Sequence, residues 1–65
     1  MITYKRLWEK LNKTGVSQYR LRMEGLSNST ITRLKHDETV STETINKLCK
    51  ILSCNVEDIM EYIED

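Results

Sequence analysis

Apolar residues recur along the chain at helical spacing, and small polar residues mark the points where this spacing restarts. At each such point an apolar residue precedes a Ser, Thr or Asn, and another apolar residue follows the polar one four positions later. This arrangement is typical of a helix start, where the polar side chain caps the helix and the two apolar residues pack together. It occurs at Ile2-Thr3 with Leu7, Val16-Ser17 with Leu21, Leu26-Ser27 with Ile31, Val40-Ser41 with Ile45, and Cys54-Asn55 with Ile59.

The pattern predicts five helices. The chain has no Pro, and its two glycines stand where the first helix ends and where a tight turn joins the second helix to the third. With 65 residues the chain has room for one domain, residues 1–65, and we expect an all-α, compact five-helix bundle. The expected helices span residues 4–14, 18–24, 28–35, 42–52 and 56–63.

Residues 17–36 form the centre of this pattern, because two short helices joined by a turn at Gly25 make a helix-turn-helix. The second of them, residues 28–35, buries only Ile31 and Leu34, which share one helix face. Its other side chains are small, polar or basic. A helix of this kind is suited to the major groove of DNA.

The candidate DNA contacts follow from the chemistry of these side chains. The guanidinium of Arg33 matches guanine O6 and N7, and the amide of Asn28 matches adenine N6 and N7. Two alternatives remain open: Arg33 contacts phosphate only, and the threonines hydrogen-bond to their own helix. The other candidates, which contact phosphate or a thymine methyl group, are Ser27, Ser29, Thr30, Thr32 and Lys35.

The charges are unevenly distributed, although the net charge of the chain is zero. Residues 1–36 carry eight basic and two acidic side chains, which gives +6, and residues 37–65 carry two basic and eight acidic ones, which gives −6. A basic half that also holds a polar helix indicates a polyanionic partner, and here we expect double-stranded DNA.

Three motifs carry a resemblance to a known family: Ser17-Gln18 with Leu21, Gly25-Leu26-Ser27 with Ile31 and Leu34, and the later stretch I-N-K-L-C-K-I-L-S-C-N-V-E-D-I-M. The chain resembles the phage Cro and repressor helix-turn-helix family, also called the Xre family, and in particular its very short bacterial members. The resemblance implies a lambda-repressor-like fold of five helices and binding to operator DNA, usually as a dimer and often as a repressor. By position, it also implies that Gln18 contacts the DNA backbone or its neighbour.

The chain departs from the family pattern at three places. It has one residue fewer between Gln18 and Gly25, and it has Arg22 where family members often have Ala. Asp37 and Glu38 follow the expected recognition helix, where family members often have Gly and phosphate-binding groups. Two carboxylates at this point would repel a phosphate.

Two functions from different classes remain in view. The first is a sequence-specific DNA-binding transcriptional regulator, a repressor, that reads the major groove with residues 28–35. The second is a protein-interaction module with the same fold, antitoxin-like or bound to a regulatory partner, which the acidic second half favours. Steep loss of DNA affinity with salt and a preferred sequence would indicate the first function.

Other classes lack the residues they need. The chain has one histidine, His36, no Cys–His arrangement and no Gly-rich phosphate loop, so we expect no enzyme and no small-molecule substrate. Cys49 and Cys54 have neither C-x-x-C nor metal-ligand spacing, so we expect no metal and no cofactor. No apolar run approaches a membrane span and no signal-peptide pattern is present, so we expect a cytoplasmic protein with reduced thiols.

A homodimer is expected from the mechanics of DNA recognition, since one recognition helix contacts only a few base pairs. The last expected helix has more apolar side chains than a small core needs, namely Met60, Tyr62 and Ile63. We therefore expect these residues to form the dimer contact, with the acidic side chains around them limiting its size.

Overall fold

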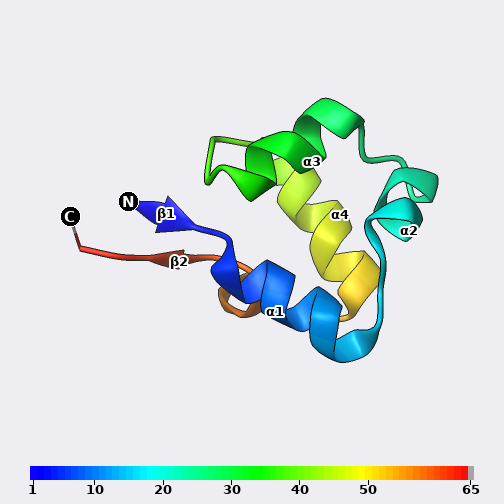
Figure 1. The fold of residues 1–65 in the computed structure, drawn as a ribbon. Helices are drawn as coiled ribbons and strands as arrows, with labels where there is room; N and C mark the ends of the chain where they lie inside the picture. The colour runs from blue at the N-terminus through cyan, green and yellow to red at the C-terminus, as the bar shows by residue number, and fades with distance from the viewer. Residues whose placement is uncertain (65) are drawn as a thin grey trace.

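The computed structural model describes residues 1–64, which fold into four α-helices and a small two-stranded sheet (Figure 1). Figure 1 shows α4 between α1 below and α3 above, with α2 on the side of the molecule far from the two strands. The elements in chain order are β1 (Ile2–Thr3), α1 (Lys5–Thr14), α2 (Gln18–Met23), α3 (Asn28–Lys35), α4 (Thr42–Leu52), the 3-10 turn η1 (Val56–Asp58) and β2 (Glu61–Tyr62).

One hydrophobic core joins all of these elements. Each α-helix contributes one side chain that is completely buried, and the fifth such side chain follows η1. These five residues are Leu7, Leu21, Leu34, Leu48 and Ile59. The helical stripes expected from the sequence for the four α-helices therefore face inward, as the spacing predicts.

Three of the expected helix caps are present. The hydroxyl oxygens of Ser17, Ser27 and Ser41 each accept a hydrogen bond from a backbone N–H three residues later, at 3.2 Å. Each serine satisfies one N–H of a first helical turn that has no partner within the helix. These caps confirm the predicted starts of α2, α3 and α4.

The helix start expected after Thr3 lies one residue too early, although the Thr3 hydroxyl oxygen accepts a hydrogen bond of 3.3 Å from the backbone N–H of Lys5, the first residue of α1. Thr3 lies in β1, and α1 begins after Tyr4, whose own side chain makes no capping bond. The carboxylate of Asp37 adds a second acceptor at this helix start, because it accepts a hydrogen bond from the Tyr4 backbone N–H at 2.9 Å and another from the Thr3 hydroxyl at 3.1 Å. A residue more than thirty positions away thus caps the first helix.

The fifth helix is also wrong, since residues 56–63 form η1 and β2 instead. Asn55 donates its backbone N–H to the Asp58 carboxylate at 3.0 Å, which closes a single turn. The backbone then pairs with β1 in an antiparallel register, with Ile2 opposite Tyr62. An eight-residue helix has little stability of its own, so pairing with a distant strand decides the structure here.

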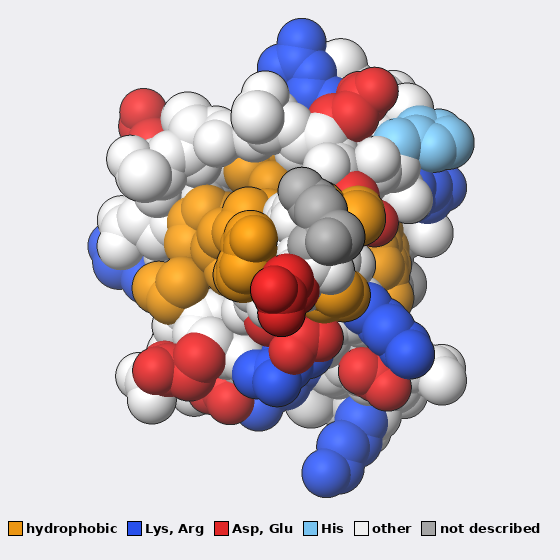
Figure 2. All heavy atoms as spheres, turned by 90° about the vertical axis from the view of Figure 1, so that its left-hand side faces the viewer, with side chains coloured by type: hydrophobic (Ala, Val, Ile, Leu, Met, Phe, Trp, Pro, Cys, Tyr) orange, Lys and Arg blue, Asp and Glu red, His pale blue; other side chains and the backbone are white. Residues whose placement is uncertain are grey.

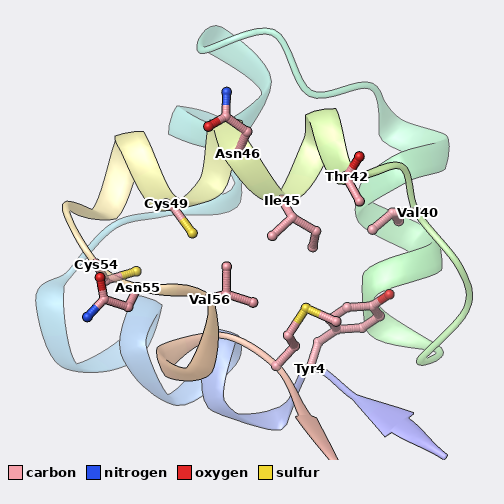
Figure 3. Close-up of a pocket in the computed structure, with 10 residues that line it drawn as sticks. Tyr4, Val40, Thr42, Ile45, Asn46, Cys49, Cys54, Asn55 and Val56 are labelled. Carbon is pink, nitrogen blue, oxygen red and sulfur yellow. The ribbon is translucent and has the colours of Figure 1, made fainter.

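An open groove runs along α4 beside η1 (Figure 3). Its lining is mostly apolar and includes Ile45, Val56 and Met60. Figure 3 shows the sulfur atoms of Cys49 and Cys54 at one end of this groove, and both thiols are free. Burial, followed by the neighbouring Cys49 thiol, raises the pKa of Cys54 above its ordinary value.

All four α-helices end with the same backbone hydrogen bond, from an N–H to the carbonyl five residues earlier. Its N···O length lies between 2.9 and 3.1 Å at every helix end. The residue just before the donor of this bond closes the helix and adopts the left-handed conformation, which is typical of this helix end. The four closing residues are Gly15 and Gly25, with φ of 75° and 104°, and Asp37 and Ser53, with φ of 55° and 50°.

Candidate nucleic-acid interface

The position of α3 is fixed by its apolar side chains. Ile31 and Leu34 are buried in the core. The indole N–H of Trp8 also donates a hydrogen bond of 3.3 Å to the Leu34 carbonyl, which holds the last turn of α3 against α1. Trp8 therefore packs at the core, and the opposite face of α3 stays exposed, with Asn28, Ser29, Thr32, Arg33 and Lys35.

A network of hydroxyl groups surrounds the start of α3. Besides capping the helix, the Ser27 hydroxyl lies 3.0 Å from that of Ser29 and 2.9 Å from that of Thr30. Thr32 donates its hydroxyl to the Asn28 carbonyl at 2.9 Å, so it hydrogen-bonds to its own helix. The hydroxyls of Ser27, Ser29, Thr30 and Thr32 thus all have partners within the protein.

Arg22 connects α2 to the first residue of α3. Its Nε donates a hydrogen bond of 2.6 Å to the Asn28 Oδ1, instead of pairing with Glu24. A bidentate contact with adenine uses both the oxygen and the nitrogen of an amide. The Asn28 oxygen has a second lone pair, so it can accept from adenine while Arg22 holds it, and the residue that replaces the family's usual Ala orients this side chain.

Two cations of α3 are available for DNA. Within residues 1–64, the side chains of Arg33 and Lys35 are exposed and form no hydrogen bond or ion pair. Arg20 on α2 is exposed and unpaired in the same way. In contrast, Arg6 is held away from α3 by the Glu61 carboxylate at 2.7 Å and the Glu57 carbonyl at 2.8 Å.

Residues 6–65 match the sequence model of the Cro/C1-type helix-turn-helix DNA-binding domain. The chain belongs to this family. Its fold matches the crystal structure of the transcriptional regulator VanUg with a TM-score of 0.89 and 31% sequence identity, over 98% of this chain and 87% of that chain. No curated protein matches the chain. The fold of this Cro/C1-type protein is that of a DNA-binding regulator, and these matches point away from an enzyme.

Gln18 lies at the start of α2 in the Cro/C1-type domain, and its side chain is half-buried. It borders a shallow hollow between α1 and α2, together with Trp8, Val16 and Ser17. The structure thus places Gln18 beside the helix start rather than on the exposed face of α3, where most of the other candidates gather.

Lys47 is a cation near the helix-turn-helix that was not expected as a site residue. It lies on α4 and borders a hollow between the capped starts of α3 and α4, beside Ser27 and Thr44. A methyl group added at Gly25 would stand 3.8 Å from its Nζ. Lys47 follows Thr44 by three positions, so the sequence alone indicates that the two side chains share one face of α4. The acidic half of the chain therefore supplies a positive charge close to α3.

Asp37, whose carboxylate was expected to repel phosphate, forms hydrogen bonds to other residues of the Cro/C1-type domain. Its carboxylate accepts from Thr3 and from the Tyr4 N–H, and the Tyr4 hydroxyl donates to the Glu38 carbonyl at 2.9 Å. Burial and the nearby Asp37 carboxylate raise the pKa of Tyr4. These bonds fasten the loop that follows α3 to the start of α1.

No group of three metal-binding side chains occurs within residues 1–64. None of the helices there is long and apolar enough to cross a membrane.

Proposed function

We propose that this protein is a sequence-specific, double-stranded DNA-binding transcriptional repressor that inserts α3 into the major groove. The observation that carries the proposal is the exposed face of α3, where Arg33 and Lys35 have no partner among residues 1–64. Repression needs only that the bound protein occupy DNA required by the transcription machinery. Membership of the Cro/C1-type family supports this function.

The candidate residues divide into two kinds of contact. Arg33 reads guanine, and Asn28 reads adenine while Arg22 orients its side-chain oxygen. Ser29 contacts a base edge or a phosphate. The remaining residues position the DNA backbone and carry little sequence information. They are Gln18, Ser27, Thr30, Thr32 and Lys35.

Two subunits read an inverted repeat in this proposal. Binding by two recognition helices about one DNA turn, roughly 34–36 Å, apart multiplies the specificity of one helix. Of the residues expected at the dimer contact, Tyr62 and Ile63 are exposed. Met60 is half-buried and packs against the core, so its part in a contact is smaller.

The test is selection of bound duplexes from a random DNA pool at moderate salt. Recovery of an inverted repeat with half-sites one turn apart would support the proposal, and recovery of a single short site would retain DNA reading without the dimer. Absence of any enrichment, with weak and strongly salt-dependent binding to all DNA, would favour the protein-interaction module instead.

Two matched variants locate the base contact. Arg33→Ala should lower affinity for the selected site and relax the preference at one base pair by roughly 1–3 kcal/mol. Lys35→Ala should weaken binding equally on all sequences and reduce the slope of log affinity against log salt by about one. If both variants lost affinity uniformly, Arg33 would be a phosphate contact.

A further inference from the structure

The two cysteines of the chain meet where α4 ends. The Cys54 backbone N–H donates a hydrogen bond to the Cys49 carbonyl at 3.1 Å, and the Ser53 N–H donates to the Lys50 carbonyl at 3.4 Å. Together with the left-handed conformation of Ser53, these bonds form a Schellman motif. In this motif the side chains at the positions of Cys49 and Cys54 make an apolar contact across the turn. Any two apolar side chains would serve that contact, whereas two cysteines add thiol chemistry.

The backbone brings the two cysteines within reach of a disulfide. With standard bond lengths, the hydrogen bond of 3.1 Å places the Cα atoms of Cys49 and Cys54 at most roughly 7 Å apart. The path through the bonded atoms is bent, so the Cα atoms lie closer than this limit. Disulfides join Cα atoms that are about 4.4–6.8 Å apart. Figure 3 shows both sulfur atoms at the same end of the groove, so a disulfide here requires side-chain rotation rather than movement of the backbone.

The thiols are free and within reach of small molecules. Both side chains are half-buried and border the open groove beside α4. Burial, followed by the Cys49 thiol, raises the pKa of Cys54, and the positive charge of Lys10 on α1 partly offsets this shift. The Cys54 thiol therefore stays protonated at rest, and it has a cation nearby that stabilises a thiolate when one forms.

The cysteine pair lies away from the surface that the dimer is proposed to use. Figure 1 shows the C-terminal end of α4 on the side of the molecule far from β1 and β2. Figure 2 views the end with the strands and shows hydrophobic side chains gathered on it, with acidic and basic groups around them. The exposed Tyr62 and Ile63 belong to this end. Two subunits joined there keep their cysteines apart, so each thiol has its nearest partner within its own chain.

We propose that Cys49 and Cys54 form a reversible redox site that takes a low-molecular-weight disulfide as its oxidant. One cysteine thiolate attacks a sulfur atom of the small disulfide, forms a mixed disulfide and releases one half of the small molecule as a thiolate. The other cysteine then attacks the sulfur of its neighbour and releases the second half. The two protein thiols thus lose two electrons and two protons, and the small disulfide gains them and becomes two thiols.

The product is an internal disulfide that fastens the end of α4 to the segment leading into η1. The starts of α3 and α4 border the same hollow, whereas the cysteines lie at the other end of α4. The disulfide therefore gives the protein a second covalent state in which the exposed face of α3 is unchanged. This inference goes beyond the proposed function and does not depend on it.

The first test exposes the full chain to a series of ratios of oxidised to reduced glutathione, with intact mass and free-thiol content as readouts. The wild-type protein should lose both thiols and two hydrogen atoms and should carry no glutathione. An excess of reduced glutathione should restore both thiols. Cys49→Ser and Cys54→Ser each remove the second nucleophile, so each variant should retain glutathione in a stable mixed disulfide.

A matched control moves one thiol to the exposed side of the same helical turn. Cys49→Ser combined with Lys50→Cys keeps two cysteines in the chain, but Lys50 is exposed, whereas Cys49 borders the groove. One residue along a helix turns the side chain by about 100°. The thiol at position 50 therefore points away from Cys54, and this variant should accumulate glutathione adducts instead of an internal disulfide.

The second test compares thermal unfolding of the oxidised and the reduced wild-type protein. The bridge closes a short loop in a turn whose backbone already has the required geometry, so oxidation should raise Tm by roughly 10 °C. A chain with both Cys49→Ala and Cys54→Ala is the control, because it should have the same Tm under oxidising and reducing conditions.

Several results would overturn the redox site. They are wild-type chains that do not react, that accumulate glutathione adducts or that form disulfide-linked dimers, an internal disulfide formed equally well with the thiol at position 50, and a Tm that does not rise on oxidation. Selection of the same DNA sequence by the oxidised and the reduced protein would support the separation of this site from α3. Loss of that selection only on oxidation would contradict the separation and leave the proposed function intact.

Discussion

The helix-turn-helix and the paired ends of the chain are held together in opposite ways. In residues 17–36, the decisive hydrogen bonds join residues three to six positions apart, such as Ser27 to Thr30 and Arg22 to Asn28. At the ends of the chain, they join Met1 to Ile63 and Tyr4 to Asp37. The first region follows its local sequence, whereas the second depends on the completed fold.

This difference has a consequence for stability. A pair of two-residue strands has no stability in isolation, and it persists because the chain around it is anchored in the core. Ile59 supplies that anchor, since it lies completely buried between η1 and β2. The paired ends are therefore as much part of the cooperative unit as the helices.

The largest expected effect tests this anchor. Ile59→Ala should lower the free energy of unfolding by about 3 kcal/mol, because it removes buried methyl groups and leaves a cavity. Denaturant unfolding followed by circular dichroism measures the change. Val56→Ala is the matched control, since Val56 is 51% exposed and its truncation should cost much less. Equal, small losses in both variants would show that the paired ends are not coupled to the core.

A second change breaks the long-range cap of α1. Asp37→Ala should lower the free energy of unfolding by about 2 kcal/mol, because the Tyr4 N–H and the Thr3 hydroxyl each lose an acceptor. Asp37→Asn keeps an acceptor oxygen and also tolerates the left-handed conformation, so it should cost less. A loss as large in Asn as in Ala would mean that charge, rather than hydrogen bonding, matters at this position.

The contrast between local and long-range hydrogen bonds explains which parts of the fold could be predicted from the sequence. The serine caps of α2, α3 and α4 need only residues within one helical turn, and their prediction is confirmed. The interior stripes of α1 to α4 are likewise local features and are buried as expected. These features defined the helix-turn-helix and the exposed face of α3, which holds most of the candidate DNA contacts.

The errors concern pairings that the local sequence does not specify. Thr3 and the stretch 56–63 have the pattern of helix starts, but each segment finds a backbone partner at the other end of the chain. The Arg22–Asn28 bond depends on how α2 and α3 cross, and Lys47 approaches α3 only because α4 packs beside it. Sequence spacing gives neither the crossing nor the packing.

A smaller effect compares how the two regions close their helices. Gly15 and Gly25, on either side of α2, adopt positive φ without strain, whereas Ser53 has φ of 50° before the C-terminal segment. Residues other than glycine, asparagine and aspartate are disfavoured there. Ser53→Gly should therefore raise the free energy of unfolding by up to about 1 kcal/mol, measured by thermal or denaturant unfolding. A decrease would show that the serine side chain stabilises the end of α4.

The smallest effect appears only in alkali and concerns Tyr4, at the boundary between β1 and α1. Its pKa in the folded protein is raised above its ordinary value of 10.0, first by burial and then by the Asp37 carboxylate. The folded state thus holds this proton more tightly than the unfolded chain does. The resulting contribution to stability is complete below pH 10.0 and declines as the pH rises through that value and beyond. Tyr4→Phe is less stable at neutral pH, because it lacks the hydrogen bond to the Glu38 carbonyl, but it should lose less stability as the pH rises above 10.0. Unfolding by urea at several pH values gives the slope of stability against pH for each protein, and the difference between the two slopes isolates Tyr4. Identical slopes would mean that Tyr4 is not linked to the fold through its proton, and that its hydroxyl acts at the junction only as a hydrogen-bond donor.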